Sequence, residues 1–259
     1  MRKCFLAAVL MFITSYVMGF QNPVDKFSAK TIFGDIIDGG FNTGIDIPGK
    51  QDVHSVQDGE IIYCSPDMVV VDHGDGIRTV YDDMDPEFEK FTVSGGEKIG
   101  HTDSCKTFHF EIYDSVMNEL VNPLLMIDGC ADRTRPEISS LFVSADGGVI
   151  RVEDGMSVKA GRTRLYMSIA DDSADAAPYN VSVYLNGQEL VDYNYETIRL
   201  DGLDFVLQSV GMRADEYYPG SGLIYIGEVE LRQGNSRLEV EVSDFYGNRF
   251  LADCLLIAK

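Results

Sequence analysis

The chain has 259 residues and a formal net charge of −21, because 42 acidic side chains outnumber 21 basic ones. Such a charge repels nucleic acid and anionic lipid surfaces, so neither is expected as a partner. The length is enough for one large or two modest domains, each with its own apolar core.

The N-terminus has the pattern of a secretory signal peptide. A basic pair at residues 2–3 precedes an apolar run, residues 4–18, which is short for a helix that crosses a bilayer. Val17 and Gly19 are small enough for a signal peptidase site. Cleavage would leave an exported, periplasmic or envelope-associated protein that begins at Phe20 and has no transmembrane segment. An uncleaved membrane anchor is the alternative.

Of the five cysteines, four lie beyond the predicted signal peptide (residues 1–19). Export allows disulfides to form, but no two cysteines are close in sequence, so the spacing resembles neither a zinc ribbon nor a redox pair. One or two disulfides and free buried thiols both fit, and the sequence does not separate the three pairings. These cysteines are Cys64, Cys105, Cys130 and Cys254.

Between residues 31 and 113, short stretches rich in β-branched and aromatic residues alternate with glycine-containing turns. Glycine supplies the positive φ angles that such turns need. Regular short strands separated by turns favour an all-β sandwich or barrel. The predicted strands are Gly44–Ile47, Val53–Val56, Glu60–Tyr63, Met68–Asp72, Arg78–Tyr81 and Phe108–Tyr113.

A second run of strands follows a polar segment, residues 129–136, which reads as a linker. The pair Asn186-Gly187 between apolar stretches predicts a type I′ hairpin, and residues 193–222 show no clear period. Residues 137–259 are therefore predicted to form an antiparallel, immunoglobulin-like β-sandwich. Its strands are predicted at Ile138–Val143, Arg164–Ile169, Asn180–Leu185, Leu223–Leu231, Leu238–Val242 and Phe250–Ile257.

Seven segments of the first half, in order, resemble the LytM or lysostaphin-type zinc endopeptidases, which cut peptide crosslinks in bacterial cell walls. Residues 41–47 resemble their Phe-His-x-Gly-Ile-Asp-Ile segment, and residues 107–111 resemble His-Leu-His-Phe-Glu. The resemblance spans residues 33–124. It implies that residues 20–128 form an antiparallel, barrel-like β domain of the peptidase type. The other segments are Val56–Ile61, Asp72–Gly76, Thr79–Met84, Gly95–Gly100 and Asn122–Leu124.

In that family zinc is held by a histidine, an aspartate and the second histidine of His-x-His, with water in the fourth position. The resemblance places Asp46 and His109 at two ligand positions and Asn42 at the third. It places Thr107 and Asp83 where catalytic histidines stand. A neutral amide is a poor exchange for imidazole at zinc, and a threonine hydroxyl is not ionised near neutral pH.

Two residues in the segment before His109 are candidate substitutes for the missing ligands, namely His101 and Cys105. Without such a substitute, Asp46 and His109 are vestigial residues that hydrogen-bond each other across a groove. No cofactor is then expected, and zinc is expected only if the site is functional.

Three functions fit these observations. The first is an exported pseudoenzyme whose degenerate LytM-type domain binds cell-wall peptide or regulates a peptidoglycan hydrolase. The second is an active zinc metalloendopeptidase with a rebuilt metal site. The third is a structural envelope protein that acts through interaction surfaces. The expected partner is a peptidoglycan peptide or another envelope protein, and the sequence favours a protein without enzymatic activity.

Overall fold

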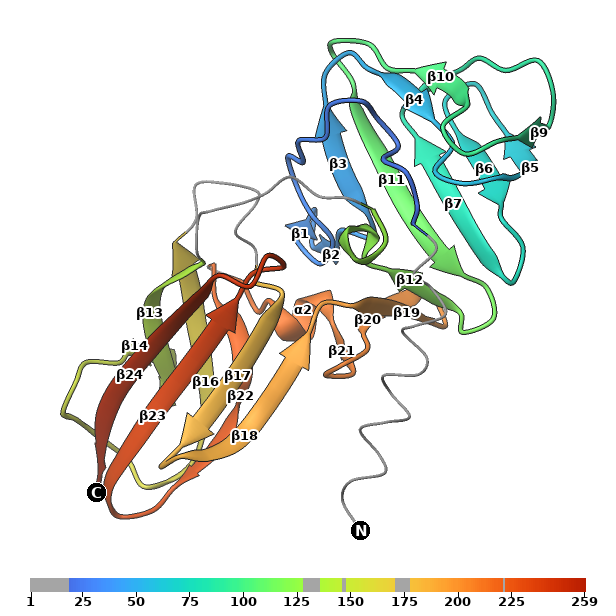
Figure 1. The fold of residues 1–259 in the computed structure, drawn as a ribbon. Coiled ribbons are helices and arrows are strands. Elements are labelled where there is room, and N and C mark those ends of the chain that lie inside the picture. Colours follow the sequence, from blue (N-terminus) through green and yellow to red (C-terminus); the bar gives the residue numbers. More distant parts are fainter. Residues whose placement is uncertain (1–18, 128–135, 146–147, 171–177, 221) are drawn as a thin grey trace. The chain divides into compact units, whose positions relative to one another are not determined.

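The computed structural model describes residues 19–127, 136–145, 148–170, 178–220 and 222–259. Within them nearly all of the regular secondary structure is β-strand, which confirms the all-β prediction (Figure 1). The predicted signal peptide, apart from Gly19, and the predicted linker, apart from Pro136, lie outside the described residues, as does Cys130. None of the helices described has the length and hydropathy of a membrane span.

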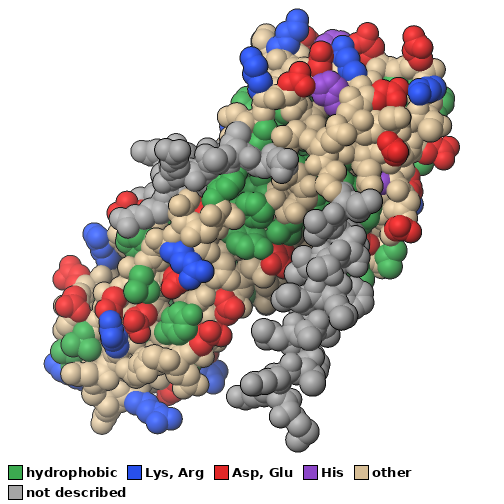
Figure 2. Space-filling view, viewed as in Figure 1, with side chains coloured by type: hydrophobic (Ala, Val, Ile, Leu, Met, Phe, Trp, Pro, Cys, Tyr) green, Lys and Arg blue, Asp and Glu red, His purple; other side chains and the backbone are tan. Residues whose placement is uncertain are grey.

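The described residues form two compact units. The first contains residues 19–29 and 44–127, and the second contains residues 30–43 and 136–259. Residues 30–43 thus cluster with the C-terminal half of the chain, although the sequence assigns them to the first domain. Acidic side chains are spread over the face seen in Figure 2 rather than gathered in one patch.

The first unit is built on an antiparallel sheet in the order β12-β11-β7-β6-β5-β9. Strand β3 shares one edge of β11 with β12, because β3 pairs with residues 107–110 and β12 with residues 112–114. Each strand predicted in this half overlaps a strand of the structure. The bounds are β3 (Ile45–Pro48), β5 (Gly59–Cys64), β6 (Val69–Asp72), β7 (Ile77–Asp82), β9 (Thr92–Val93), β11 (Thr107–Asp114) and β12 (Glu119–Val121).

Strand β11 shows why this sheet forms. Its residues alternate between buried and half-buried, so one face packs into the core while the other stays accessible. Tyr81 on β7 stacks with Phe108 and lies tilted against Phe110, at ring-centroid distances of 6.3 and 5.3 Å. Its hydroxyl accepts a hydrogen bond from the Val56 amide at 3.0 Å. The aromatic core therefore fixes β11 and β7 side by side and turns the alternate residues outward.

Three further strands form a small antiparallel sheet in the order β4-β10-β8. They are β4 (Asp52–His54), β10 (Lys98–His101) and β8 (Asp85–Pro86). A β-carbon at Gly100 would lie 2.5 Å from the Asp85 carbonyl oxygen, so only glycine allows β10 and β8 to approach this closely. At the end of the unit, Asn122 caps a 3₁₀ helix, η1 (Pro123–Leu125), by accepting the Leu124 amide hydrogen bond at 3.1 Å.

The second unit contains a four-stranded sheet, β14-β13-β16-β22, and a five-stranded sheet, β15-β24-β23-β17-β18. The hairpin prediction at Asn186 and Gly187 is confirmed, because both residues have positive φ and join β17 to β18. The sheets are antiparallel as predicted, with one exception, the parallel pairing of β15 with β24. The bounds are β13 (Glu137–Ala145), β14 (Gly148–Arg151), β15 (Met156–Val158), β16 (Gly161–Ala170), β17 (Asn180–Leu185), β18 (Gln188–Asn194), β22 (Ile224–Leu231), β23 (Gly234–Ser243) and β24 (Arg249–Ala258).

Residues 193–222, which lack a sequence period, hold several short elements. Strands β19 and β20 form a hairpin, and β20 also pairs with β21. Each is too short to show a clear alternation, which explains why the sequence did not predict them. The elements are β19 (Thr197–Asp201), β20 (Asp204–Leu207), β21 (Met212–Arg213) and the helix α2 (Ala214–Tyr217).

Residues 30–43 form a hairpin in the second unit, with strands β1 (Ile36–Ile37) and β2 (Gly40–Phe41). The Phe41 ring lies 6.0 Å from the ring of Tyr217. Gly34 has a φ of 88° and lies so close to the Tyr195 ring that a β-carbon would clash with it. Tyr193, Tyr195 and Tyr217 are buried with their hydroxyl groups hydrogen-bonded to one another. A tyrosine cluster therefore anchors this hairpin.

This anchoring predicts a difference between two glycines of the same segment. Gly34 and Gly39 both have positive φ, but only Gly34 lies against a side chain, whereas Gly39 has open space around it. Gly34→Ala is expected to lower the free energy of unfolding by about 1–3 kcal/mol more than Gly39→Ala, because it adds a clash to the shared backbone cost. Urea denaturation of both variants measures the difference. Equal losses would show that the contact with Tyr195 does not hold the hairpin.

Candidate functional site

The accessible face of β11 brings together four ionisable residues from three adjacent strands. His109 lies directly opposite Asp46 on β3 and opposite Asp82 on β7. Glu111 follows two residues later on the same face, because side chains alternate along a strand. Residues paired in this way have β-carbons about 4.5–5.5 Å apart, so their side chains interact. We call these four residues, with Thr107, the polar face.

Both ring nitrogens of His109 are engaged by carboxylates. Nδ1 lies 2.8 Å from Oδ1 of Asp46, and Nε2 lies 3.1 Å from Oε1 of Glu111. The three side chains are 20%, 17% and 21% exposed, so water screens these contacts only in part. An ionised carboxylate only accepts hydrogen bonds, and only a protonated imidazole donates from both nitrogens. The geometry is therefore that of an imidazolium between two carboxylates.

The electrostatic balance of the polar face follows from these contacts. Burial alone would lower the pKa of His109, but the hydrogen bonds to the Asp46 and Glu111 carboxylates outweigh it and raise that pKa to about 10. Burial raises the pKa of Asp82, as does repulsion from Asp83, while the charge of His109 acts in the opposite direction. His109 thus carries a positive charge at neutral pH and offsets part of the surrounding negative charge.

The remaining residues predicted for the site lie in different settings. Thr107 is half-buried on the polar face and pairs with Pro48 of β3. Asp83 is exposed in the turn after β7, where its φ is 58°. Asn42 is buried in the second unit, where its amide nitrogen lies 3.4 Å from the hydroxyl of Thr31. The structure thus places Thr107 beside Asp46 and His109 and leaves Asp83 facing solvent.

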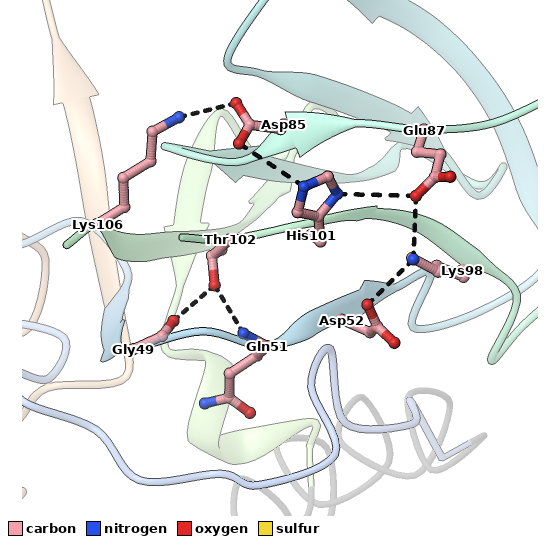
Figure 3. A network of polar contacts seen from close by, with 9 residues as sticks. All are labelled: Gly49, Gln51, Asp52, Asp85, Glu87, Lys98, His101, Thr102 and Lys106. Atoms are coloured by element: carbon pink, nitrogen blue, oxygen red, sulfur yellow. Dashed lines mark hydrogen bonds and ion pairs between the residues drawn. The ribbon is translucent and has the colours of Figure 1, made fainter. Parts of the chain in front are cut away.

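His101, a candidate substitute ligand, belongs to the three-stranded sheet and takes part in another set of contacts (Figure 3). Its Nε2 lies 4.0 Å from Asp85 and its Nδ1 lies 3.7 Å from Glu87. Lys106 contacts Asp85 at 3.0 Å, and Lys98 contacts Glu87 at 3.0 Å. The ring nitrogens of His101 thus face two carboxylates of a surface network of alternating charges.

The cysteines that the structure describes are free thiols. Cys64 and Cys105 are exposed, and Cys254 is buried. The Cys105 sulfur lies 3.9 Å from the hydroxyl of Ser104. Burial raises the pKa of the Cys254 thiol to about 11, so this group is not a thiolate at neutral pH. Of the two alternatives left open by the sequence, the three described cysteines fit free thiols, and Cys130 lies outside the described residues.

These side chains do not fit the zinc site that the family resemblance implies. Zinc takes a neutral imidazole through its ring lone pair, whereas both ring nitrogens of His109 lie within hydrogen-bonding distance of carboxylates. Over the described part of the chain, no three His, Cys, Asp or Glu side chains are grouped so as to hold a metal ion. We derive no catalytic step through a metal.

Two members of the polar face were missed at the level of sequence. Glu111 stands two residues after His109 in an alternating stretch, so its position on the same face could have been inferred from the sequence. Asp82 could not, because its position opposite His109 depends on the pairing register of β7 and β11.

A protein-family model matches residues 135–257, nearly the whole C-terminal part of the second unit and less than half of the chain. A comparison with curated proteins gives no match.

Several solved structures match in part. The structure of the SpoIIQ–SpoIIIAH pore-forming complex matches with a TM-score of 0.36 and 23% identity, over 42% of this chain and 91% of the matched one. A crystal structure of the SpoIIIAH and SpoIIQ complex has the same TM-score of 0.36 and identity of 23%, over 41% and 98%. Fibronectin(III)-like modules of Clostridium thermocellum CbhA match with a TM-score of 0.27 and 10% identity, over 91% and 93%.

The two carboxylate contacts predict how the pKa of His109 responds to substitution. Asp46→Asn and Glu111→Gln each remove one negative partner, so each should lower the pKa of His109 by about one or more. An NMR titration of the imidazole ring measures the change. Glu60→Gln, which removes an exposed carboxylate elsewhere in the same sheet, is the control and should leave the pKa of His109 unchanged. If the first two variants behave like the control, His109 does not contact Asp46 and Glu111 in solution.

The same shift predicts a pH dependence of stability. The pKa of His109 is raised from 6.5 to about 10 in the folded protein, so its stabilising effect is complete below about pH 6.5 and is lost as the pH rises toward 10. The difference in free energy of unfolding between the wild type and His109→Gln should therefore shrink over this interval. Urea denaturation at a series of pH values measures it. A constant difference would contradict the assignment of a charged His109.

Proposed function

We propose that this chain is an exported cell-envelope protein that acts by binding another envelope protein and catalyses no reaction. The first unit is then a degenerate LytM-type domain, and the β-sandwich of the second unit supplies the main partner surface. The proposal is supported by the signal-peptide pattern, by the resemblance of residues 33–124 to the peptidase family, and by the state of the residues at the family's catalytic positions.

The single observation that carries the proposal is the engagement of both nitrogens of His109 by Asp46 and Glu111. To bind zinc, the imidazolium would have to lose its proton and give up at least one of these hydrogen bonds. Thr107 and Asp83 would then have to replace two histidines in activating water and stabilising the oxyanion. Losing such groups typically costs about 10² to 10³ in rate for each. The contacts of His109 therefore suit a binding surface better than a catalytic zinc site.

Binding of cell-wall peptide by the first unit is the second candidate function. It is favoured by the partial exposure of His109 and Glu111, which leaves a charged, half-buried face on β11. Peptides with free amino and carboxyl groups could contact both signs of charge there. This function also requires no catalysis.

The proposal predicts that the purified protein, supplied with Zn²⁺, releases no soluble peptides from purified peptidoglycan. His109→Ala should leave this result unchanged, because no hydrolysis depends on that residue. The release of peptides is measured by chromatography of the soluble fraction. A zinc-dependent release of peptides that His109→Ala abolishes would overturn the proposal and support the hypothesis of an active metalloendopeptidase.

The two binding functions are separated by a second arm of the same test. Cosedimentation with purified peptidoglycan reports on wall binding, and photocrosslinking from exposed positions of the second unit reports on a protein partner. Crosslinks to one envelope protein without cosedimentation support the partner function. Cosedimentation that Glu111→Gln weakens, without a specific crosslink, supports the wall-peptide function.

A further inference from the structure

The second unit contains a hollow of about 260 Å³ that the polar face does not include. One side comes from the β1–β2 hairpin, and the other comes from β20, β21 and the start of α2. The hollow therefore exists because the tyrosine cluster anchors residues 30–43 in this unit. Its main lining side chains are Phe41, Leu203, Asp204, Phe205, Arg213 and Asp215.

An exposed apolar side chain stands at its rim. Asp201 pairs with Asp204, which leaves Gly202 and Leu203 as a two-residue turn between β19 and β20. The positive φ of Gly202 allows this turn, and Leu203 at its tip is 99% exposed. Phe205, on the next strand, is 40% exposed. Apolar groups presented in this way around a hollow mark an interaction site.

The size of the hollow limits what it can hold. Sites for small molecules usually enclose about 300–1,000 Å³, and this hollow, at about 260 Å³, is smaller. It is large enough for one bulky side chain. Protein interfaces are commonly anchored by a single aromatic or aliphatic side chain in such a pocket. The volume therefore favours a protein segment over a free metabolite.

The charges around the hollow narrow the choice of partner. Arg213 contacts Asp204 at 3.4 Å and Asp215 at 3.1 Å, so one positive charge is shared by two negative ones. Glu216, in α2, adds a further negative charge, whereas the charge of Asp201 is offset by Arg199 at 4.0 Å. A negative rim attracts Lys and Arg and repels anionic lipid. With a net charge of −21 on this chain, a second copy is also disfavoured.

We propose that this hollow is the docking site for a protein segment that carries a large apolar side chain flanked by Lys or Arg. The apolar side chain enters between Phe41 and Phe205 and covers Leu203. The basic residues contact Asp204 and Asp215, which the single guanidinium of Arg213 does not neutralise. This inference rests on the proposed function as an interaction protein and assigns the surface that the partner uses.

Three short peptides test the proposal on the full mature chain. The probe is Gly-Lys-Phe-Lys-Gly, and the controls are Gly-Glu-Phe-Glu-Gly and Gly-Lys-Ala-Lys-Gly. NMR titration of the labelled protein gives both the affinity and the residues that respond. The probe should shift the amide signals of residues 37–41 and 200–216, and both controls should bind at least about tenfold more weakly.

Matched variants locate the site. Leu203→Ser should weaken binding of the probe about tenfold, because it removes an apolar group that binding would bury, and its full exposure in the free protein means that the fold is unaffected. Leu251→Ser changes another exposed leucine of the same unit, which is 53% exposed on β24, and should have no effect. Higher salt should weaken binding of the probe, since the basic residues contact exposed carboxylates.

Each of the other outcomes overturns the proposal. Signals that shift elsewhere, equal binding of the acidic control, or no binding at millimolar peptide would each show that the hollow is not this site. Sedimentation analysis that finds a dimer dissociated by Leu203→Ser would assign the surface to a second copy of the chain. If the photocrosslinks to an envelope protein persist in Leu203→Ser, the interaction function stands and only the assignment of this surface fails.

Discussion

The hydrogen bonds that His109 donates to Asp46 and Glu111 determine the character of the first unit. The sheet places three carboxylates around one imidazole, in a protein that is already strongly acidic. Without a cation at this position, these carboxylates would repel one another across adjacent strands. His109 therefore serves as a counter-charge between the carboxylates of β3 and β11, next to the backbone pairing of these strands.

The same strand contributes to the core and to the polar face. Because side chains alternate along β11, Phe108 and Phe110 point into the core and His109 points outward. Core packing therefore requires this strand independently of any function of its accessible face. The aromatic core preserves the geometry of the face. Because Asp46 and His109 stabilise each other, replacing either one carries a structural cost.

The local features of the sequence predicted much of the fold. Alternation identified β11, and the Asn186-Gly187 pair identified the hairpin between β17 and β18, because both signals depend only on neighbouring residues. Features that depend on distant pairing were not predictable. The position of Asp82 beside His109 requires the register between two strands, and the parallel pairing of β15 with β24 requires the completed second unit.

In the candidate site, too, the sequence did not predict features that depend on distant contacts. The family resemblance gave Asp46 and His109 as neighbours, and the structure joins them by a hydrogen bond. The resemblance treated Asn42 as part of the same site, whereas the structure groups this residue with the second unit. Residues 30–43 contain no signal of this choice, since the tyrosines that anchor them lie more than 150 residues away in the sequence.

That long separation has a consequence for the order in which the protein is completed. The hairpin at residues 30–43 leaves the ribosome early, but Tyr195 and Tyr217, its partners, are made near the end of the chain. The strands of the first unit can assemble before then, whereas the hairpin cannot pack until the tyrosine cluster has formed. Residues 30–43 can therefore reach their final position only after the C-terminal half has been synthesised. Forming a contact between residues so far apart in the sequence is also intrinsically slow.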